Sequence, residues 1–424
     1  MSTPRAVSAR AAASALRAAH SRKTLPRAIV GFDGFLDEIA QVVDVRGGAG
    51  PRDFTPIPTI DAFARRVASA AGRSANVELV VRETRPGGNG PLLASGLSAL
   101  GAKVIYIGCV GAPAQKDAPA SRPLPIHPVF EPLAGRCDRV VAVAGPGRTD
   151  ALEFTDGKVM LNVPAAIDAV TWETVAGRLG GPAKAYEHFA DRELLAIVNW
   201  SVMAGVDDIC RGLMRDVLPR LAAHKLTSGK TRRLFVDLSD PAKRADADLR
   251  AALAIIGAMN ANIPVTLGLN LAEAERLAAV YHVKAPPAPP EPLRVSAFPD
   301  LASRVLRLSQ ELRDAVRVAC VVIHPREGAA ACDDKDEPCW LDGPFTKSPV
   351  LSTGAGDHFN AGFAFGRCLE LPLDQCLALA VATSGAYVRD GASPTHDRVA
   401  AFLDALPPPE SAPLVVPKAA PKRA

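Results

Sequence analysis

Several absences limit what this chain of 424 residues can be. No apolar run approaches the roughly 20 residues that a membrane-spanning helix needs, so we expect no membrane contact. Basic and acidic residues nearly balance, 49 against 45, and the net charge of +4 is spread along the chain. Because nucleic-acid binding requires a clustered basic surface, we also expect no nucleic-acid partner. The apolar content of 48% is ample for a large core and excludes global disorder.

The cysteines and histidines show no metal-ligand spacing. Eight cysteines are scattered without a Cys-x-x-Cys pair, and eight histidines form no His-x-x-x-His pattern, which argues against structural zinc. Unpaired cysteines in a chain of this length are typical of a reducing compartment, so we predict free buried thiols and a cytoplasmic location. Residues 1–27 are basic and contain no acidic residue, as in an organellar transit peptide. The same Ala/Arg/Pro bias runs through the whole chain, which favours a surface helix instead.

The central region alternates short apolar runs with helical patterns. Continuous apolar strands joined by helices favour an α/β fold: a doubly wound, mostly parallel sheet with helices on both faces. The predicted strands are 28–35, 103–108, 195–200, 234–238, 264–269 and 318–324, and the predicted helices include 91–100, 206–223, 247–256 and 271–280.

Two regions interrupt this alternation and predict a small β-lid. Residues 38–85 alternate weakly and contain proline and glycine. Within residues 138–165, two apolar segments flank Asp156-Gly157, which is typical of a β-hairpin. An edge hairpin on the main sheet is the alternative to a lid. We assign an N-terminal extension to 1–27, one domain to 28–405 and a disordered tail to 406–424, with a stiff proline-rich loop at 285–292.

Residues 352–362 carry the strongest functional signal. Gly354-Ala355-Gly356 precedes a helical pattern that we expect to begin at Asp357. The glycines let a ligand approach the backbone, and a helix N-terminus directs free N–H groups at an anion. Asp357 places a carboxylate beside that anion, where it could accept a proton from an attacking hydroxyl. The alternative is that Asp357 only caps the helix.

Two commoner phosphate-binding motifs do not fit. The third glycine of a dinucleotide fingerprint would fall at Phe359. The first glycine of a P-loop ending at Gly229-Lys230-Thr231 would fall at His224, and that segment lies after a helical pattern and before a strand, the reverse of a P-loop.

The wider pattern resembles the ribokinase-like (PfkB) family of sugar kinases. Ser352–Asp357 is similar to the second signature of that family, and the segment that begins Gly87-Gly88-Asn89 is similar to the first. The resemblance spans roughly residues 28 to 395. It implies an ATP-dependent kinase with a β-lid, which phosphorylates a hydroxyl of a small sugar or polyol.

The resemblance gives the motif residues their roles. Asp357 would be the general base, and the backbone N–H groups of Gly354, Ala355 and Gly356 would hold the charge of the transferring phosphoryl group.

The Asn270-Leu271-Ala272-Glu273 segment matches the family's Asn-x-x-Glu element. Asn270 and Glu273, three residues apart, would share one helix face and organise Mg²⁺ through water. Asn270 would also contact the nucleotide phosphates, although it is equally a good helix cap.

The sugar-binding carboxylate has two candidates, Asp33 and Asp37. The glycine turn at 87–89 would let the backbone approach the sugar closely. Carboxylates suit a neutral polyol and would repel a phosphorylated substrate, but Arg148 in the hairpin region keeps a phosphosugar open.

Two positions depart from the family pattern. Leu351 replaces the aspartate that begins the second signature and is tied to a monovalent-cation site in some members, and Leu92 replaces an asparagine of the first signature. These departures leave a non-catalytic sugar-binding protein as an alternative.

A nucleoside kinase of the same family is the other alternative, with Phe32, Phe35 and Trp200 as candidates for a base-binding slot. His358 is expected to be a solvated residue at the helix start, because neighbouring helix residues do not share a face. The sequence leaves the oligomeric state open, with a homodimer as one of the alternatives.

Overall fold

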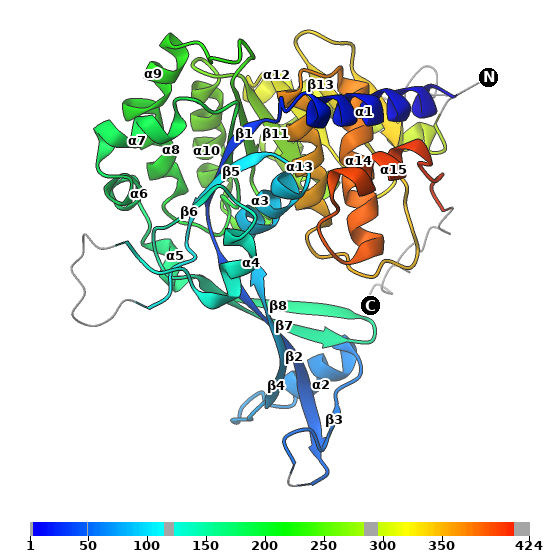
Figure 1. Cartoon of the computed structure of the whole chain (residues 1–424). Coiled ribbons are helices and arrows are strands. Elements are labelled where there is room, and N and C mark those ends of the chain that lie inside the picture. The colour runs from blue at the N-terminus through cyan, green and yellow to red at the C-terminus, as the bar shows by residue number, and fades with distance from the viewer. Residues whose placement is uncertain (1–2, 49, 114–122, 284–295, 411–424) are drawn as a thin grey trace.

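The computed structural model shows a large α/β domain from which a small β-sheet projects (Figure 1). The predicted proline-rich loop and the last 14 residues of the predicted tail lie outside the described residues, so neither prediction can be compared with the structure. The structure describes residues 3–48, 50–113, 123–283 and 296–410.

A nine-stranded sheet forms the centre of the large domain. In sheet order its strands are β14 (Cys339–Asp342), β13 (Gly328–Asp333), β12 (Cys320–Ile323), β11 (Val265–Leu269), β10 (Arg233–Asp237), β9 (Leu194–Ile197), β1 (Arg27–Phe32), β5 (Lys103–Gly108) and β6 (Arg139–Ala142). All pairings from β12 to β6 are parallel, and only β13 and β14 are antiparallel. The predicted doubly wound, mostly parallel sheet is confirmed.

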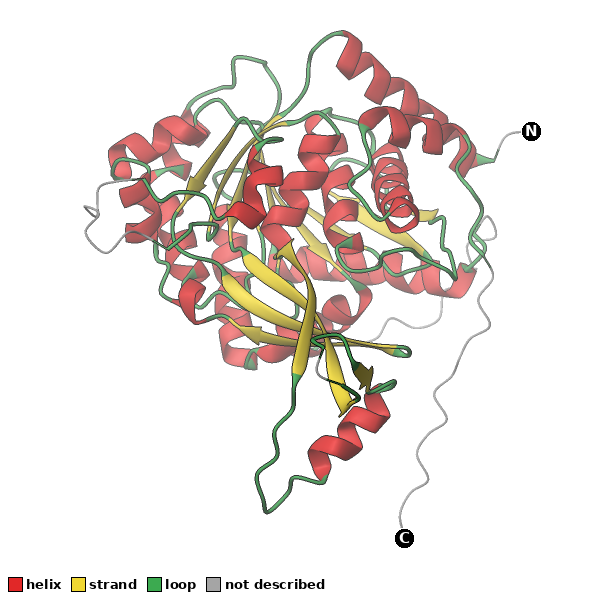
Figure 2. Ribbon diagram, turned by 60° about the horizontal axis from the view of Figure 1, so that its bottom comes forward, coloured by secondary structure: helices red, strands yellow, loops and turns green. Residues whose placement is uncertain are grey.

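Helices cover both faces of this sheet (Figure 2), and alternate residues along its strands pack into two separate hydrophobic cores. Along β1, Ile29 packs into one core and Val30 into the other. One core contains α6 (Trp172–Arg178), α7 (Pro182–Phe189), α8 (Val206–Asp216), α9 (Leu218–Ala223), α10 (Asp246–Met259), α11 (Leu271–Val280) and α12 (Pro299–Val316). The other contains α1 (Pro4–Ser21), α3 (Asn89–Ala99), α13 (Ala355–Cys368), α14 (Leu373–Asp390) and α15 (His396–Asp404).

The projecting part is a second sheet with one helix on it. Its strands are β2 (Phe35–Arg46), β3 (Phe54–Pro56), β4 (Leu79–Gly87), β7 (Gly147–Phe154) and β8 (Gly157–Val163), and its helix is α2 (Ile60–Ala68). The hairpin β7–β8 pairs with β2 and not with the main sheet, so the edge-hairpin alternative is wrong. Phe154 pairs with Gly157, which places the turn at Thr155-Asp156, one residue earlier than predicted. We call this second sheet and α2 the lid.

Two helical predictions need correction. The predicted helix 206–223 is two helices, α8 and α9, because Pro219 occupies the first turn of the second one. Helix α13 begins at Ala355 rather than at Asp357, since Gly354 adopts the left-handed conformation (φ 86°) and forms the N-cap. Asp357 is therefore inside the first turn and does not cap the helix.

The predicted N-terminal helix is observed as α1, which packs against α14 and α15. Arg5 anchors its start by donating hydrogen bonds to the carbonyl oxygens of Asp342, Leu406 and Pro407. All eight cysteines are free thiols, and six of them are buried. Within the described ranges, no helix has both the length and the apolar character needed to cross a membrane. Short helices complete the fold: α4 (Glu131–Ala134), α5 (Ala165–Asp168), η1 (Pro128–Phe130) and η2 (Pro241–Lys243).

Candidate active site

The glycine turn before α13 is built on a left-handed residue. A Cβ atom added to Gly354 would lie 2.9 Å from the Tyr387 hydroxyl, so both the φ angle and the space require glycine there. The N–H groups of Gly354 and Gly356 form no hydrogen bond with any described residue and are free for a ligand. The N–H of Ala355 instead donates to the Ser352 carbonyl oxygen at 3.2 Å. The structure thus leaves two of the three predicted donors available.

Asp357 lies in the first turn of α13 and is only 7% exposed. The Asn89 amide nitrogen, at the start of α3, donates to its Oδ1 at 3.0 Å. Burial first, and then the neighbouring Asp237 carboxylate, raise the pKa of Asp357 well above its ordinary value. The approach of the turn at 87–89 to the sugar stays a prediction, and in this structure the Asn89 amide holds the candidate base.

Asp237 and Asn360 belong to the same site. Asp237 ends β10, and its carboxylate accepts hydrogen bonds from the Asn360 side chain and the Ser239 N–H, both at 2.6 Å. Burial raises the pKa of Asp237. The sequence left Asp237 without a role and did not single out Asn360, although Asn360 follows Asp357 by three residues and so shares its helix face.

Asn270 and Glu273 form the capping box of α11, as the helix-cap alternative for Asn270 predicted. The Glu273 N–H donates to Asn270 Oδ1 at 3.0 Å, and the Asn270 N–H donates to Glu273 Oε2 at 2.8 Å. Burial, followed by repulsion from Asp237, raises the pKa of Glu273 to about 9. The described residues contain no cluster of three side chains already arranged to ligate a metal directly.

The acidic side chains nevertheless fit a hydrated Mg²⁺ ion. Glu273 lies close enough to Asp237 and Asp357 for each carboxylate to raise its pKa, and all three are buried. Mg²⁺ prefers oxygen ligands and keeps several waters, so it can be held by carboxylates that do not touch it. A cation here would relieve a repulsion that the fold otherwise leaves uncompensated.

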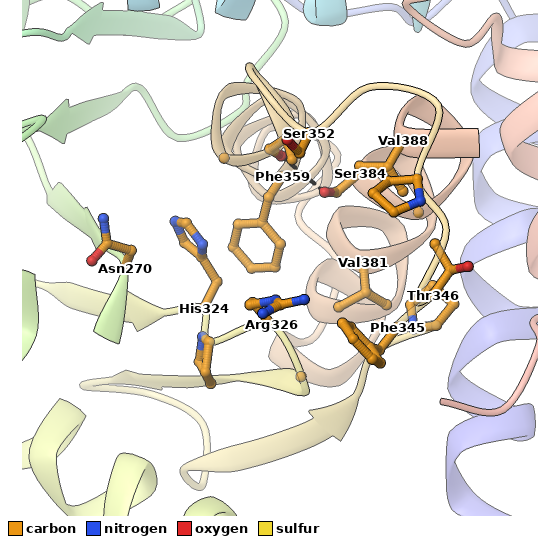
Figure 3. A pocket seen from close by; sticks show the side chains of 18 residues that line it. Asn270, His324, Arg326, Phe345, Thr346, Ser352, Phe359, Val381, Ser384 and Val388 are labelled. Atoms are coloured by element: carbon orange, nitrogen blue, oxygen red, sulfur yellow. Dashed lines mark hydrogen bonds between the residues drawn. The ribbon is translucent and has the colours of Figure 1, made fainter. Parts of the chain in front are cut away.

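A cavity of about 410 Å³ opens beside the glycine turn (Figure 3). Ser352, Ala355 and Gly356 line it next to the turn, and Asn270 lines it from α11. The rings of His324 and Phe359 pack against each other there, with their centroids 4.5 Å apart. Burial lowers the pKa of His324 to about 4, so this wall is neutral near pH 7. An apolar part of the wall comes from α14 and from the loop after β14: Pro344, Phe345, Val381, Gly385 and Val388. Arg326, which precedes β13, adds a positively charged side chain to the lining.

A second, smaller cavity lies between the lid and the other side of the turn. Its polar lining combines lid residues with residues of the large domain: Asp37, Arg85, Lys158, Thr353 and Tyr387. Burial raises the pKa of Asp37. Leu92 and Leu351, the two departures from the family pattern, both line this cavity and form part of its apolar wall.

Asp33 does not face that cavity, because its side chain is fully buried. Its carboxylate accepts hydrogen bonds from the Gly90 N–H at 2.8 Å and the Asn199 amide at 2.6 Å. A Cβ atom on Gly88 would lie 2.6 Å from Asp33 Oδ2, so the carboxylate fits directly under the turn. In this structure Asp33 supports the turn at 87–90, and its contact with the substrate stays a prediction.

Gly87 makes room for Asp37, the other candidate for the sugar-binding carboxylate. A Cβ atom at Gly87 would come within 2.2 Å of Asp37 Oδ1, and the two residues lie on neighbouring strands, β4 and β2. Asp37 is thus the candidate carboxylate that the structure places in the cavity wall.

Five further residues lie elsewhere than predicted or do not line the cavity. His358 is fully buried rather than solvated, because helix α14 covers its side of α13. Phe32, Phe35 and Trp200 are core residues and form no slot for a nucleobase beside the cavity. Arg148 is half-exposed, pairs with Asp150 at 3.2 Å and does not line the cavity.

Comparisons with known proteins agree with this geometry. A family model described as prokaryotic ketohexokinase matches residues 6–406. A ketohexokinase from Haloferax volcanii is 30% identical over 406 residues, covering 95% of this chain and 97% of that protein. Ribokinase from Arabidopsis thaliana in complex with ribose and ATP has a similar fold, with a TM-score of 0.53, 16% identity and coverage of 89% of this chain and 99% of that chain. Escherichia coli phosphofructokinase-2 in complex with fructose-6-phosphate gives a TM-score of 0.55 and 15% identity, covering 89% of this chain and 99% of that chain.

Proposed function

Because this chain belongs to the prokaryotic ketohexokinase family, and is therefore a carbohydrate kinase, we propose that it transfers the γ-phosphoryl group of ATP to a hydroxyl of a ketohexose. One observation carries the proposal. The turn before α13 separates the two cavities: Ser352, Ala355 and Gly356 line the large one, and Leu351 and Thr353 line the small one. A phosphoryl donor and a hydroxyl acceptor bound on the two sides would meet at this turn, beside Asp357.

Asp357 is the general base of the proposed reaction. It accepts the proton of the sugar hydroxyl as that oxygen attacks the γ-phosphorus, and the ADP oxygen leaves. The Asn89 amide orients the Asp357 carboxylate for this step. The free N–H groups of Gly354 and Gly356, at the positive end of the α13 dipole, stabilise the charge on the transferring group.

Asn270, Glu273 and Asp237 would hold Mg²⁺ through its water shell. A bound Mg²⁺ ion supplies positive charge to the polyphosphate of ATP. Burial, followed by repulsion from Asp237, raises the pKa of Glu273 to about 9, so a positive charge beside these carboxylates would be favourable.

A neutral sugar suits the small cavity better than a phosphosugar. Each of the two cations in its wall already has an acidic partner, since Arg85 pairs with Glu83 at 2.6 Å and Lys158 with Glu153 at 2.7 Å. The half-buried Asp37 carboxylate would repel a phosphate and accept hydrogen bonds from hydroxyls. Tyr387 and Thr353 add further polar groups to the same wall.

The two alternatives carry less support. A nucleoside kinase would need a slot for a base, and the aromatic candidates for one are buried in the core. A non-catalytic protein disagrees with membership of a kinase family over almost the whole chain.

Coupled assays of ADP formation test the proposal. The purified chain should phosphorylate fructose and other ketohexoses with ATP and Mg²⁺, and much less efficiently fructose-6-phosphate, aldohexoses and nucleosides. Efficient phosphorylation of a nucleoside or a phosphosugar, with no turnover of any ketohexose, would contradict the proposed substrate class.

A further inference from the structure

Three consecutive carbonyl groups of the glycine turn are each held by a side chain. The Tyr387 hydroxyl donates to the Thr353 oxygen at 2.7 Å. The Ser384 hydroxyl, labelled in Figure 3, donates to the Ala355 oxygen at 2.9 Å. Between them, His358 Nδ1 lies 2.8 Å from the Gly354 oxygen. Ser384 and Tyr387 are three residues apart on α14, so one helix supplies two of the three donors.

The third donor, His358, is fixed in one protonation state by its surroundings. The Gly354 oxygen can only accept a hydrogen bond, so Nδ1 carries the proton. Burial lowers the pKa of His358 to about 4, which keeps the ring neutral, so Nε2 accepts from the Ser393 hydroxyl at 2.8 Å. The ring also stacks on Tyr387, with centroids 3.7 Å apart and planes inclined by 13°.

These contacts decide where the N–H groups of the turn point. In a planar trans peptide the C=O and the following N–H point in opposite directions, so a fixed carbonyl fixes the next N–H. Tyr387 thereby sets the direction of the Gly354 N–H, and Ser384 sets that of the Gly356 N–H. His358 fixes the peptide between them, whose Ala355 N–H donates to the Ser352 carbonyl oxygen, so it holds the middle of the turn rather than a free donor. Neither the Gly354 N–H nor the Gly356 N–H has a hydrogen-bond partner among the described residues.

We infer that His358, Ser384 and Tyr387 are positioning residues that preorganise the anion site for the transferring phosphoryl group. The inference rests on the proposed function. Preorganised donors matter most when negative charge develops in the transition state, because they need no reorientation at that moment. The trio therefore stabilises the transition state more than it stabilises bound ADP.

His358 gives the cleanest test, because it is fully buried and lines neither cavity. His358→Leu removes the donor, whereas His358→Asn places an amide nitrogen where Nδ1 was and restores it. Ser384→Ala removes one hydroxyl from α14. Thr383→Val is its matched control, since the Thr383 hydroxyl donates to Leu379 within the same helix and does not touch the turn.

Two quantities are measured for each variant: kcat with the best sugar of the wild type, and the affinities for ADP and for ADP with aluminium fluoride, which mimics the transferring group. Loss of a direct oxyanion donor costs about 10²–10³ in rate, so an indirect loss of about tenfold is expected for His358→Leu and Ser384→Ala. Affinity for ADP–aluminium fluoride should fall equally, affinity for ADP alone by less than about twofold, and His358→Asn and Thr383→Val should stay near wild type.

Wild-type kcat in both His358→Leu and Ser384→Ala would overturn the inference, as would equal losses of affinity for ADP and ADP–aluminium fluoride. If His358→Leu does not fold, Ser384→Ala against Thr383→Val decides alone. Absence of any sugar kinase activity in the wild type would instead contradict the proposed function, so the two failures are distinguishable.

Discussion

At the residue scale, Asp357 carries the chemistry of the proposed mechanism, and Asp357→Asn removes only the proton acceptor. Turnover should fall by roughly 10²–10⁴, the usual contribution of a positioned general base. Sugar and ATP affinity should change little, because the amide preserves the shape of the side chain. Steady-state kinetics and calorimetric titrations check both expectations, and a near-wild-type kcat would exclude Asp357 as the base.

Substitution of Asp33 should change stability, whereas substitution of Asp37 should change the affinity for the sugar. Asp33→Asn replaces a carboxylate oxygen that accepts from a buried donor, so it should lower the free energy of unfolding by about 1–3 kcal/mol. Asp37→Asn should leave stability nearly unchanged and raise the KM for the sugar, since Asp37 faces the cavity. Urea unfolding and kinetics of both variants provide the comparison. A stable Asp33→Asn variant with a raised KM would reverse the assignment.

At the element scale, the start of α11 combines the observed capping box with the proposed organisation of Mg²⁺. Glu273→Gln keeps an oxygen for the Asn270 N–H, so the capping box and the helix should persist. The lost charge should weaken activity most at low magnesium, with partial recovery as magnesium rises, because Glu273 acts on the hydrated ion. Rates over a magnesium series test this, and an equal loss at every concentration would indicate a packing role.

Helix α1 belongs to the packed structure of the large domain. Leu16 on its inner face is fully buried, and Leu16→Ala should cost about 2–5 kcal/mol of stability. Val7 on the same helix is 53% exposed, so Val7→Ala is the matched control and should be nearly neutral. Kinetic constants of the folded protein should be unchanged in both variants. Equal unfolding midpoints for both would show that α1 contributes little.

At the scale of the whole molecule, three distant segments bring their carboxylates into one site, and activity should depend jointly on pH and magnesium. Asp357 must be ionised to act as the base, and its pKa is raised, so kcat/KM should increase with pH along an acid limb. A bound cation lowers the pKa of nearby carboxylates by about 1–3 units, so higher magnesium should shift this limb to lower pH.

The shift should be smaller in Glu273→Gln, which removes one of the repelling carboxylates. The pH–rate profiles of both proteins at low and high magnesium give the measurement. An acid limb that stays fixed in the wild type would show that no cation interacts with Asp357.

The sequence by itself determined the sheet and the glycine turn before α13, because both depend on local patterns. The buried parallel strands appear as continuous apolar runs, and β5 and α11 have the predicted boundaries. In the Gly354–Asp357 segment, glycine permits the left-handed turn, and a carboxylate follows within the first helical turn. Both features lie within four consecutive residues, so the sequence alone shows them.

Only the tertiary structure decided which side chains complete the site. Asp33 and Asp37 are alike in sequence, but the direction of the backbone buries the first under a turn and turns the second toward the lid. Asp237, Asn360 and the carbonyl-holding side chains come from β10, α13 and α14, and nothing in their local sequence shows that these elements meet. Long-range packing sets burial, and burial sets the pKa values and hydrogen-bond partners on which the proposed chemistry depends.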